Sequence, residues 1–186
     1  MDEIKKVSGF LVILFKASIG GIFIFLAYAW FSFEDSSWMW GPFSASTTIK
    51  TPQGLVSCNN INWTFFTKIL AYSSYLISKL ATVLELVFLI KIFNNYHVGE
   101  LFNLTNTRLY KKLSLIFMID ALLITPLTQT LGMLAATLTN PPGERILYIG
   151  FGTPNLQALF LGAILFVLSW VMMQGHLLQE EHRYTI

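Results

Sequence analysis

The chain has 186 residues, of which 54% are hydrophobic and only 12% are charged, and its formal net charge is +2. Soluble proteins carry about 25% charged residues, so this composition argues against a soluble protein, and the small net charge argues against direct binding to nucleic acid. The single cysteine, Cys58, excludes an intramolecular disulfide and the redox chemistry of paired thiols.

Four long apolar runs fill most of the chain. They cover residues 7–33, 67–93, 113–138 and 155–178. About 20 apolar residues suffice for a helix to cross the hydrocarbon core of a bilayer, and each run exceeds that length. The sequence therefore predicts an all-α membrane protein, a four-transmembrane-helix bundle that forms a single integral membrane domain over residues 1–186.

The first run is too long for the apolar part of a signal peptide, so we expect it to stay in the protein as the first helix. Its small residues include Gly9, Ser18, Gly20 and Gly21. A strip of small residues lets another helix approach closely, so we expect a neighbouring span to pack along it.

The first polar loop, residues 34–66, has the pattern of a β-hairpin. β-Branched residues are frequent in 46–50 and 55–58, and the sequence between these segments is Thr-Pro-Gln-Gly, which is typical of a turn. Residues 145–149 of a later loop, 139–154, could add a strand to it. The sequence therefore predicts a small β-hairpin cap at this end of the bundle.

Two features mark the third run and the loop before it. The loop, residues 94–112, has apolar residues near helical spacing, which predicts a short amphipathic helix on the membrane surface; the alternative is a plain polar connector. Within the third run lies Pro126. Proline lacks a backbone donor, so we expect the helix to kink there.

The distribution of Lys and Arg predicts the orientation in the membrane. One side carries seven of them, namely Lys5, Lys6, Lys91, Arg108, Lys111, Lys112 and Arg183. The opposite side carries two, Lys50 and Arg145. Because cytoplasmic segments are enriched in Lys and Arg, we expect both termini and residues 94–112 in the cytoplasm, and the hairpin cap and residues 139–154 outside it.

Two segments carry short motifs. Residues 99–109, Gly-Glu-Leu-Phe-Asn-Leu-Thr-Asn-Thr-Arg-Leu, contain Gly-x-x-Phe followed by Asn and then Leu, and residues 175–186 contain Gly-x-x-Leu-x-Glu-Glu and close on Thr-Ile. These segments resemble a bacterial family called domain of unknown function 2975, which has the first motif between its second and third helices and the second motif at a terminus that closes on Thr-Ile or Thr-Val. The four-span layout agrees over nearly the whole chain, whereas His97 and Val98 depart from the more usual small or acidic residues.

The resemblance implies a bacterial inner-membrane protein of unassigned activity. Members of the family are often encoded beside a small helix-turn-helix regulator, which implies membrane-linked transcriptional control. The resemblance brings no catalytic residue with it.

Ionisable residues within the apolar runs are candidate functional residues, because a charge near the bilayer centre costs about 2.5–3.5 kcal/mol on insertion scales. These candidates are Lys16, Lys79, Glu85 and Asp120. Similar depths make a pair of Lys16 with Glu85 or with Asp120 compatible with the geometry, whereas Lys79 would reach Asp120 only through a tilt or a kink. The group is either a structural ion pair that fixes helix register, or a proton relay, an ion relay or a polar ligand site.

The C-terminal tail places His176 four residues before Glu180, with His182 nearby. Without a third ligand at a fixed spacing this is weak evidence for a metal site, and we predict no bound metal. The sequence has no phosphate-binding loop and no HExxH, GxSxG or dinucleotide motif, so we predict no cofactor and no enzymatic activity.

We therefore predict a membrane sensor or regulator that docks a cytoplasmic regulatory protein, for which the family resemblance suggests a small helix-turn-helix regulator. The candidate docking residues are Gly99, Phe102, Asn106, Arg108, Glu180 and Glu181. The alternative is a small transporter or channel subunit with an intramembrane charged path, which would need a homo-oligomer to form a pore. Membrane lipids are expected partners in both cases, and direct contact with nucleic acid is not.

Overall fold

The computed structural model describes residues 2–32, 48–51, 54–57, 64–145, 147, 149 and 153–184. In chain order, its elements are α1 (Asp2–Ser32), β1 (Thr48–Thr51), β2 (Gly54–Ser57), α2 (Phe65–Val98), α3 (Leu104–Ile119), the π-helix η1 (Asp120–Ile124), α4 (Thr125–Thr137) and α5 (Thr153–Tyr184). Helix α3, η1 and α4 follow one another without a break from Leu104 to Thr137, and they cover nearly all of the third predicted run, 113–138.

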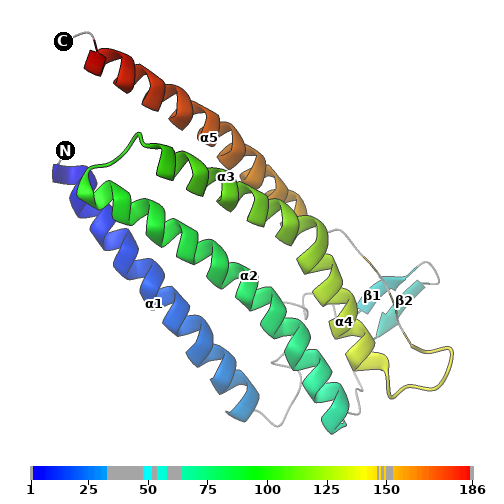
Figure 1. Cartoon of the computed structure of the whole chain (residues 1–186). Coiled ribbons are helices and arrows are strands. Elements are labelled where there is room, and N and C mark those ends of the chain that lie inside the picture. The colour runs from blue at the N-terminus through cyan, green and yellow to red at the C-terminus, as the bar shows by residue number, and fades with distance from the viewer. Residues whose placement is uncertain are drawn as a thin grey trace.

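The helices pack in the order in which they follow one another along the chain. Helices α1 and α2 lie antiparallel side by side, α2 packs on α3 and α4, and α5 lies against α3 and η1 (Figure 1). The start of α1, the α2–α3 turn and the end of α5 share one end of the molecule, which we call the turn end. Near it, Ile92, Tyr110 and Leu113 form a buried core, against which residues of α5 such as Leu168 also pack.

Three segments are long and apolar enough to cross a membrane: Glu3–Leu26, Leu104–Thr137 and Asn155–Glu181. They overlap the first, third and fourth predicted spans, residues 7–33, 113–138 and 155–178. Helix α2 has 34 residues and contains the whole second predicted span, 67–93, but it is not among these three segments. Its middle carries Lys79 and Glu85. Length and composition therefore support three spans, and the fourth needs an argument from packing.

The connection between α2 and α3 is shorter than predicted. Residues 99–103 alone join the two helices, and the separate amphipathic helix expected within 94–112 does not form. Gly99 ends α2 in the left-handed conformation, with φ of 96°, and Asn103 caps the start of α3 with its side chain. Both caps satisfy free backbone groups at the helix ends, so the helices can stop and start within a few residues.

Strands β1 and β2 pair antiparallel, with Ile49 opposite Val56. The central residues of the predicted turn lie outside the described part of the chain. The described residues of the proposed third strand, Arg145, Leu147 and Ile149, belong to no strand, and the described sheet has two strands. The position of the hairpin as an extracytoplasmic cap stays a prediction.

The third span bends at η1, immediately before Pro126 (Figure 1). The backbone N–H of Thr125 donates to the carbonyl oxygen of Asp120, five residues back, instead of to that of Ala121. Pro126 has no N–H to donate in its turn. The predicted kink therefore takes the form of a π-helical turn, which is a common cause of bends in helices.

Small residues allow close helix contacts, though not along the whole strip predicted on the first helix. A methyl group added at Gly9 would lie 3.2 Å from Nδ1 of His97 on α2, whereas at Gly20 it would meet nothing within 4 Å. The tighter contact joins α5 to α3. There, a methyl group at Gly162 would lie 3.1 Å from the carbonyl oxygen of Ser114.

We expect Gly162→Ala to lower the free energy of unfolding by about 1–3 kcal/mol, because the added methyl group must displace the backbone of α3. Thermal unfolding of the purified protein in detergent measures this change. Gly20→Ala is the matched control, since its methyl group meets open space and alanine favours a helix. Equal midpoints for the two variants would contradict the close α3–α5 contact.

Candidate functional site

A cluster of charged and polar groups lies at the level of η1. Glu85 of α2 and Asp120 at the start of η1 are both half-buried, and the charges of their carboxylates interact. One oxygen of each, Oε1 of Glu85 and Oδ1 of Asp120, is buried and has no hydrogen-bond partner among the described residues. Such carboxylate oxygens are costly in an apolar environment, so this pair of carboxylates is electrostatically unfavourable.

A cation and a hydroxyl lie near this pair. The hydroxyl of Thr125 donates to Oδ2 of Asp120 over 3.3 Å. Lys79 precedes Glu85 by six residues on α2, and its charge acts electrostatically on Asp120. Its Nζ also lies 5.0 Å from the ring centroid of Tyr75, a distance at which a cation is attracted to the ring face. The cluster thus joins α2 to the bent third span.

The pairing of Lys16 suggested by depth does not occur among the described residues. Lys16 is exposed on α1, and α1 packs against α2 rather than against η1. The described residues contain no ion pair between Lys16 and either Glu85 or Asp120. Depth alone does not decide which side chains meet, because each helix also has a rotation about its axis.

The start of α5 is attached to the same bend. Asn155 is buried, and its Nδ2 donates to the carbonyl oxygen of Ala121 over 2.8 Å. That carbonyl lacks its usual helical donor, because the N–H of Thr125 is directed to Asp120 and Pro126 has none. Asn155 and Thr125 were not among the predicted site residues. The sequence feature that could have pointed to them is Pro126. Because proline has no backbone N–H, it leaves a backbone carbonyl of the helix free, and another side chain must then donate a hydrogen bond to that carbonyl.

At the turn end, Asn106 is the centre of a hydrogen-bond network. This side chain is fully buried. Its Nδ2 donates to the carbonyl oxygens of Glu100 at 2.6 Å and Leu101 at 3.0 Å, and its Oδ1 accepts from Nδ2 of Asn95 at 2.6 Å. Asn106 therefore holds the turn in shape from inside, and its side chain has no exposed surface to offer a partner.

The same turn is attached to both outer helices. The ring of Phe102 packs on Gly175 of α5, where a methyl group would lie 2.7 Å from its Cδ1. Nδ1 of His176 lies 3.3 Å from the carbonyl oxygen of Phe102. On the other side, Nδ1 of His97 lies 2.8 Å from the carbonyl oxygen of Lys5 in α1. Since a carbonyl oxygen only accepts, each contact requires a proton on Nδ1.

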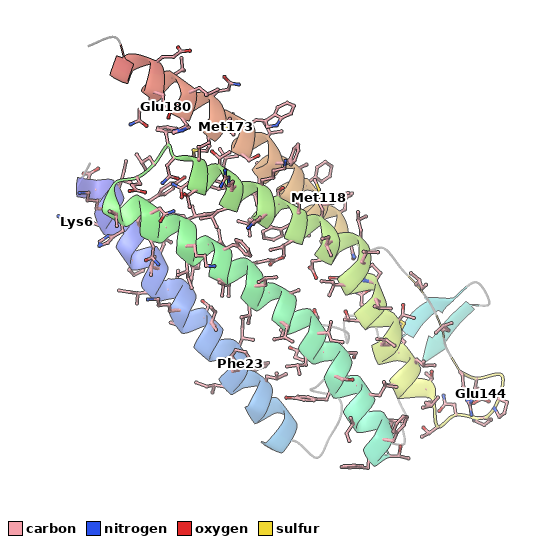
Figure 2. The ribbon with its side chains drawn as sticks, in the orientation of Figure 1. Lys6, Phe23, Met118, Glu144, Met173 and Glu180 are labelled. Carbon is pink, nitrogen blue, oxygen red and sulfur yellow. The ribbon has the colours of Figure 1, made fainter. Side chains whose placement is uncertain are left out.

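The predicted docking residues thus separate into two groups. Gly99, Phe102 and Asn106 build the turn, although the Phe102 ring stays partly exposed. The side chains of Arg108, Glu180 and Glu181 are exposed. Figure 2 places Glu180 near the end of α5, at the turn end, and Glu144 at the opposite end of the molecule.

The described residues contain no group of three His, Cys, Asp or Glu side chains that could hold a metal ion. Nε2 of His176 lies 3.6 Å from Oε1 of Glu180, one helical turn further along α5. This distance fits an ion pair when the histidine is protonated. The side chain of His182 lies outside the described part of the structure.

We expect Glu85→Gln to raise the free energy of unfolding by about 1 kcal/mol, because a neutral amide removes the repulsion from Asp120 and can donate to it. Lys79→Gln should lower the same quantity, because the two carboxylates lose a nearby positive charge. Thermal unfolding in detergent measures both changes. Glu144→Gln, which alters an exposed carboxylate far from the cluster, should leave the midpoint unchanged; a lower midpoint for Glu85→Gln would refute the repulsion.

Residues 43–186 match the model of a family described as protein of unknown function (DUF2975). The matched segment covers more than three quarters of the chain and includes the α2–α3 turn, the charged cluster and α5. No curated protein and no solved structure gives a match to this chain. The two short motifs at residues 99–109 and 175–186 thus pointed to the correct family: the chain belongs to the DUF2975 family.

Proposed function

We propose that this protein is a non-enzymatic regulator of the bacterial inner membrane that crosses the bilayer four times and docks a cytoplasmic protein at its turn end. The packing of α2 supports the fourth crossing. This helix lies between α1 on one side and α3 and α4 on the other, and both neighbours belong to segments that can span a membrane. A helix of 34 residues held between two spanning helices crosses the bilayer with them.

The orientation follows from the Lys and Arg residues. Lys6 is exposed and lies at the turn end (Figure 2). Lys91, in the last third of α2, and Arg108, near the start of α3, are also exposed, whereas the opposite loops hold few cations. In this orientation the turn end is cytoplasmic, and β1 and β2 belong to an extracytoplasmic cap. The chain termini are then both cytoplasmic.

The observation that carries the docking proposal is a rigid turn with exposed acidic side chains beside it. The Asn106 network fixes the turn, and the Phe102–Gly175 contact fixes the turn against α5. Glu100, Glu180 and Glu181 are exposed at this end. A basic surface complements these carboxylates, and a DNA-binding regulator of the kind that the family resemblance implies carries such a surface.

A second candidate function is a transporter or channel subunit. It is favoured by one buried carboxylate oxygen each on Glu85 and Asp120 that has no hydrogen-bond partner among the described residues. Polar groups within a membrane often mark an ion or proton path. Lys79, Glu85 and Asp120 would then line the path, and a homo-oligomer would complete the pore.

A topology experiment tests the membrane layout. A fluorescent protein fused after Ile186 should fluoresce, and alkaline phosphatase inserted after Glu144 should be active, because one position is cytoplasmic and the other is outside. The reciprocal fusions are the controls and should both be silent. Alkaline phosphatase activity after Ile186 would show that the C-terminus is outside and overturn the orientation.

A binding experiment tests the docking function. We expect the purified regulator encoded beside the gene to bind the intact protein in nanodiscs. The double variant Glu180→Gln with Glu181→Gln should raise the dissociation constant of this complex about tenfold, because two charges are lost from the contact. Glu144→Gln is the matched control and should bind like the unmodified chain. Unchanged affinity in the double variant excludes this docking surface. Ion flux in liposomes that is abolished by Asp120→Asn would favour the transporter instead.

A further inference from the structure

One face of α3 carries three cations in succession. Arg108, Lys111 and Lys112 are all exposed. At about 100° per residue they fall within a sector roughly 100° wide, opposite the buried side chains of Tyr110 and Leu113. Helix α3 itself, from Leu104 to Ile119, contains no acidic residue. The positive charge of this face is therefore not neutralised by its own helix.

The same face turns apolar toward the middle of the membrane. Leu115 and Ile119 follow Arg108 at helical spacings of seven and eleven residues, and their side chains are 44% and 47% exposed. Eleven residues of helix rise about 16 Å, which is close to half of the roughly 30 Å hydrocarbon thickness of a bilayer. A charged group at one end and a leaflet-long apolar strip at the other match the shape and polarity of one phospholipid.

Within the described part of the chain, the three cations also form no ion pair. No carboxylate in the described part of the chain forms an ion pair with Arg108, Lys111 or Lys112. The exposed acidic residues at the turn end, such as Glu100 and Glu180, lie on the turn and on α5. Cations that lie at the headgroup level and face outward attract anionic lipids.

We propose that this face of α3 binds an anionic phospholipid, with its phosphate on Arg108, Lys111 and Lys112 and an acyl chain along Leu115 and Ile119. Arg108 then contacts lipid rather than a docked protein. The lipid surface needs the membrane orientation given above, but it does not depend on any cytoplasmic partner. Failure of partner binding and failure of lipid binding are therefore separate results.

The experiment compares two variants that each lose three positive charges. The test variant combines Arg108→Gln, Lys111→Gln and Lys112→Gln. The control combines Lys6→Gln, Lys16→Gln and Lys91→Gln, which are exposed cations of α1 and α2. Each protein is purified in mild detergent, and retention of added phosphatidylglycerol or phosphatidylcholine is measured by native mass spectrometry together with the thermal midpoint.

We expect the unmodified chain and the control variant to retain phosphatidylglycerol over phosphatidylcholine and to unfold at a higher temperature when it is added. The test variant should lose about tenfold or more of this preference and the thermal shift. An equal loss in both variants would mean a general charge effect and overturn the site. Protection of the unmodified chain by inorganic phosphate alone, to the same extent, would overturn the assignment to a lipid.

Discussion

Inside a lipid bilayer, each backbone N–H and C=O must find its partner within the protein, because there is no water to supply one. The third span meets this constraint at its bend. The π-helical turn and Pro126 leave the carbonyl of Ala121 without a helical donor, and the side chain of Asn155 replaces that donor. This one hydrogen bond satisfies the carbonyl that the kink leaves free, and it also holds the start of α5 against η1. The position of α5 therefore depends on the π-helical bend in the helix before it.

The same constraint shapes the turn end. Two long helices reverse direction within residues 99–103, and their free backbone groups are satisfied by the caps at Gly99 and Asn103 and by the buried amide of Asn106. The turn is then fixed to α1 through His97 and to α5 through Phe102. The family motif is therefore first of all a structural device, and the exposed carboxylates beside it gain a defined position from that rigidity.

The charges divide the molecule into three levels that serve the proposed roles. Exposed acidic groups lie at the turn end, the cations of α3 lie one to two helical turns deeper, and Lys79, Glu85 and Asp120 lie at the level of the bend. A partner protein, lipid headgroups and the bilayer interior would meet these levels in that order. The free-energy cost of an ionised group rises as its environment becomes less polar. The charged groups at the deepest level therefore have the largest electrostatic cost.

The sequence by itself determined the apolar runs, the bend at Pro126 and the family, because hydrophobicity, chain stiffness and short motifs are local properties. It did not determine that Asn106 is buried, that Asn155 reaches Ala121, or that Lys79 rather than Lys16 acts on Asp120. Those facts depend on how far each helix is rotated about its axis and which helices are neighbours. Rotation and neighbours result from side-chain packing between segments far apart in the chain, so only the tertiary structure decided them.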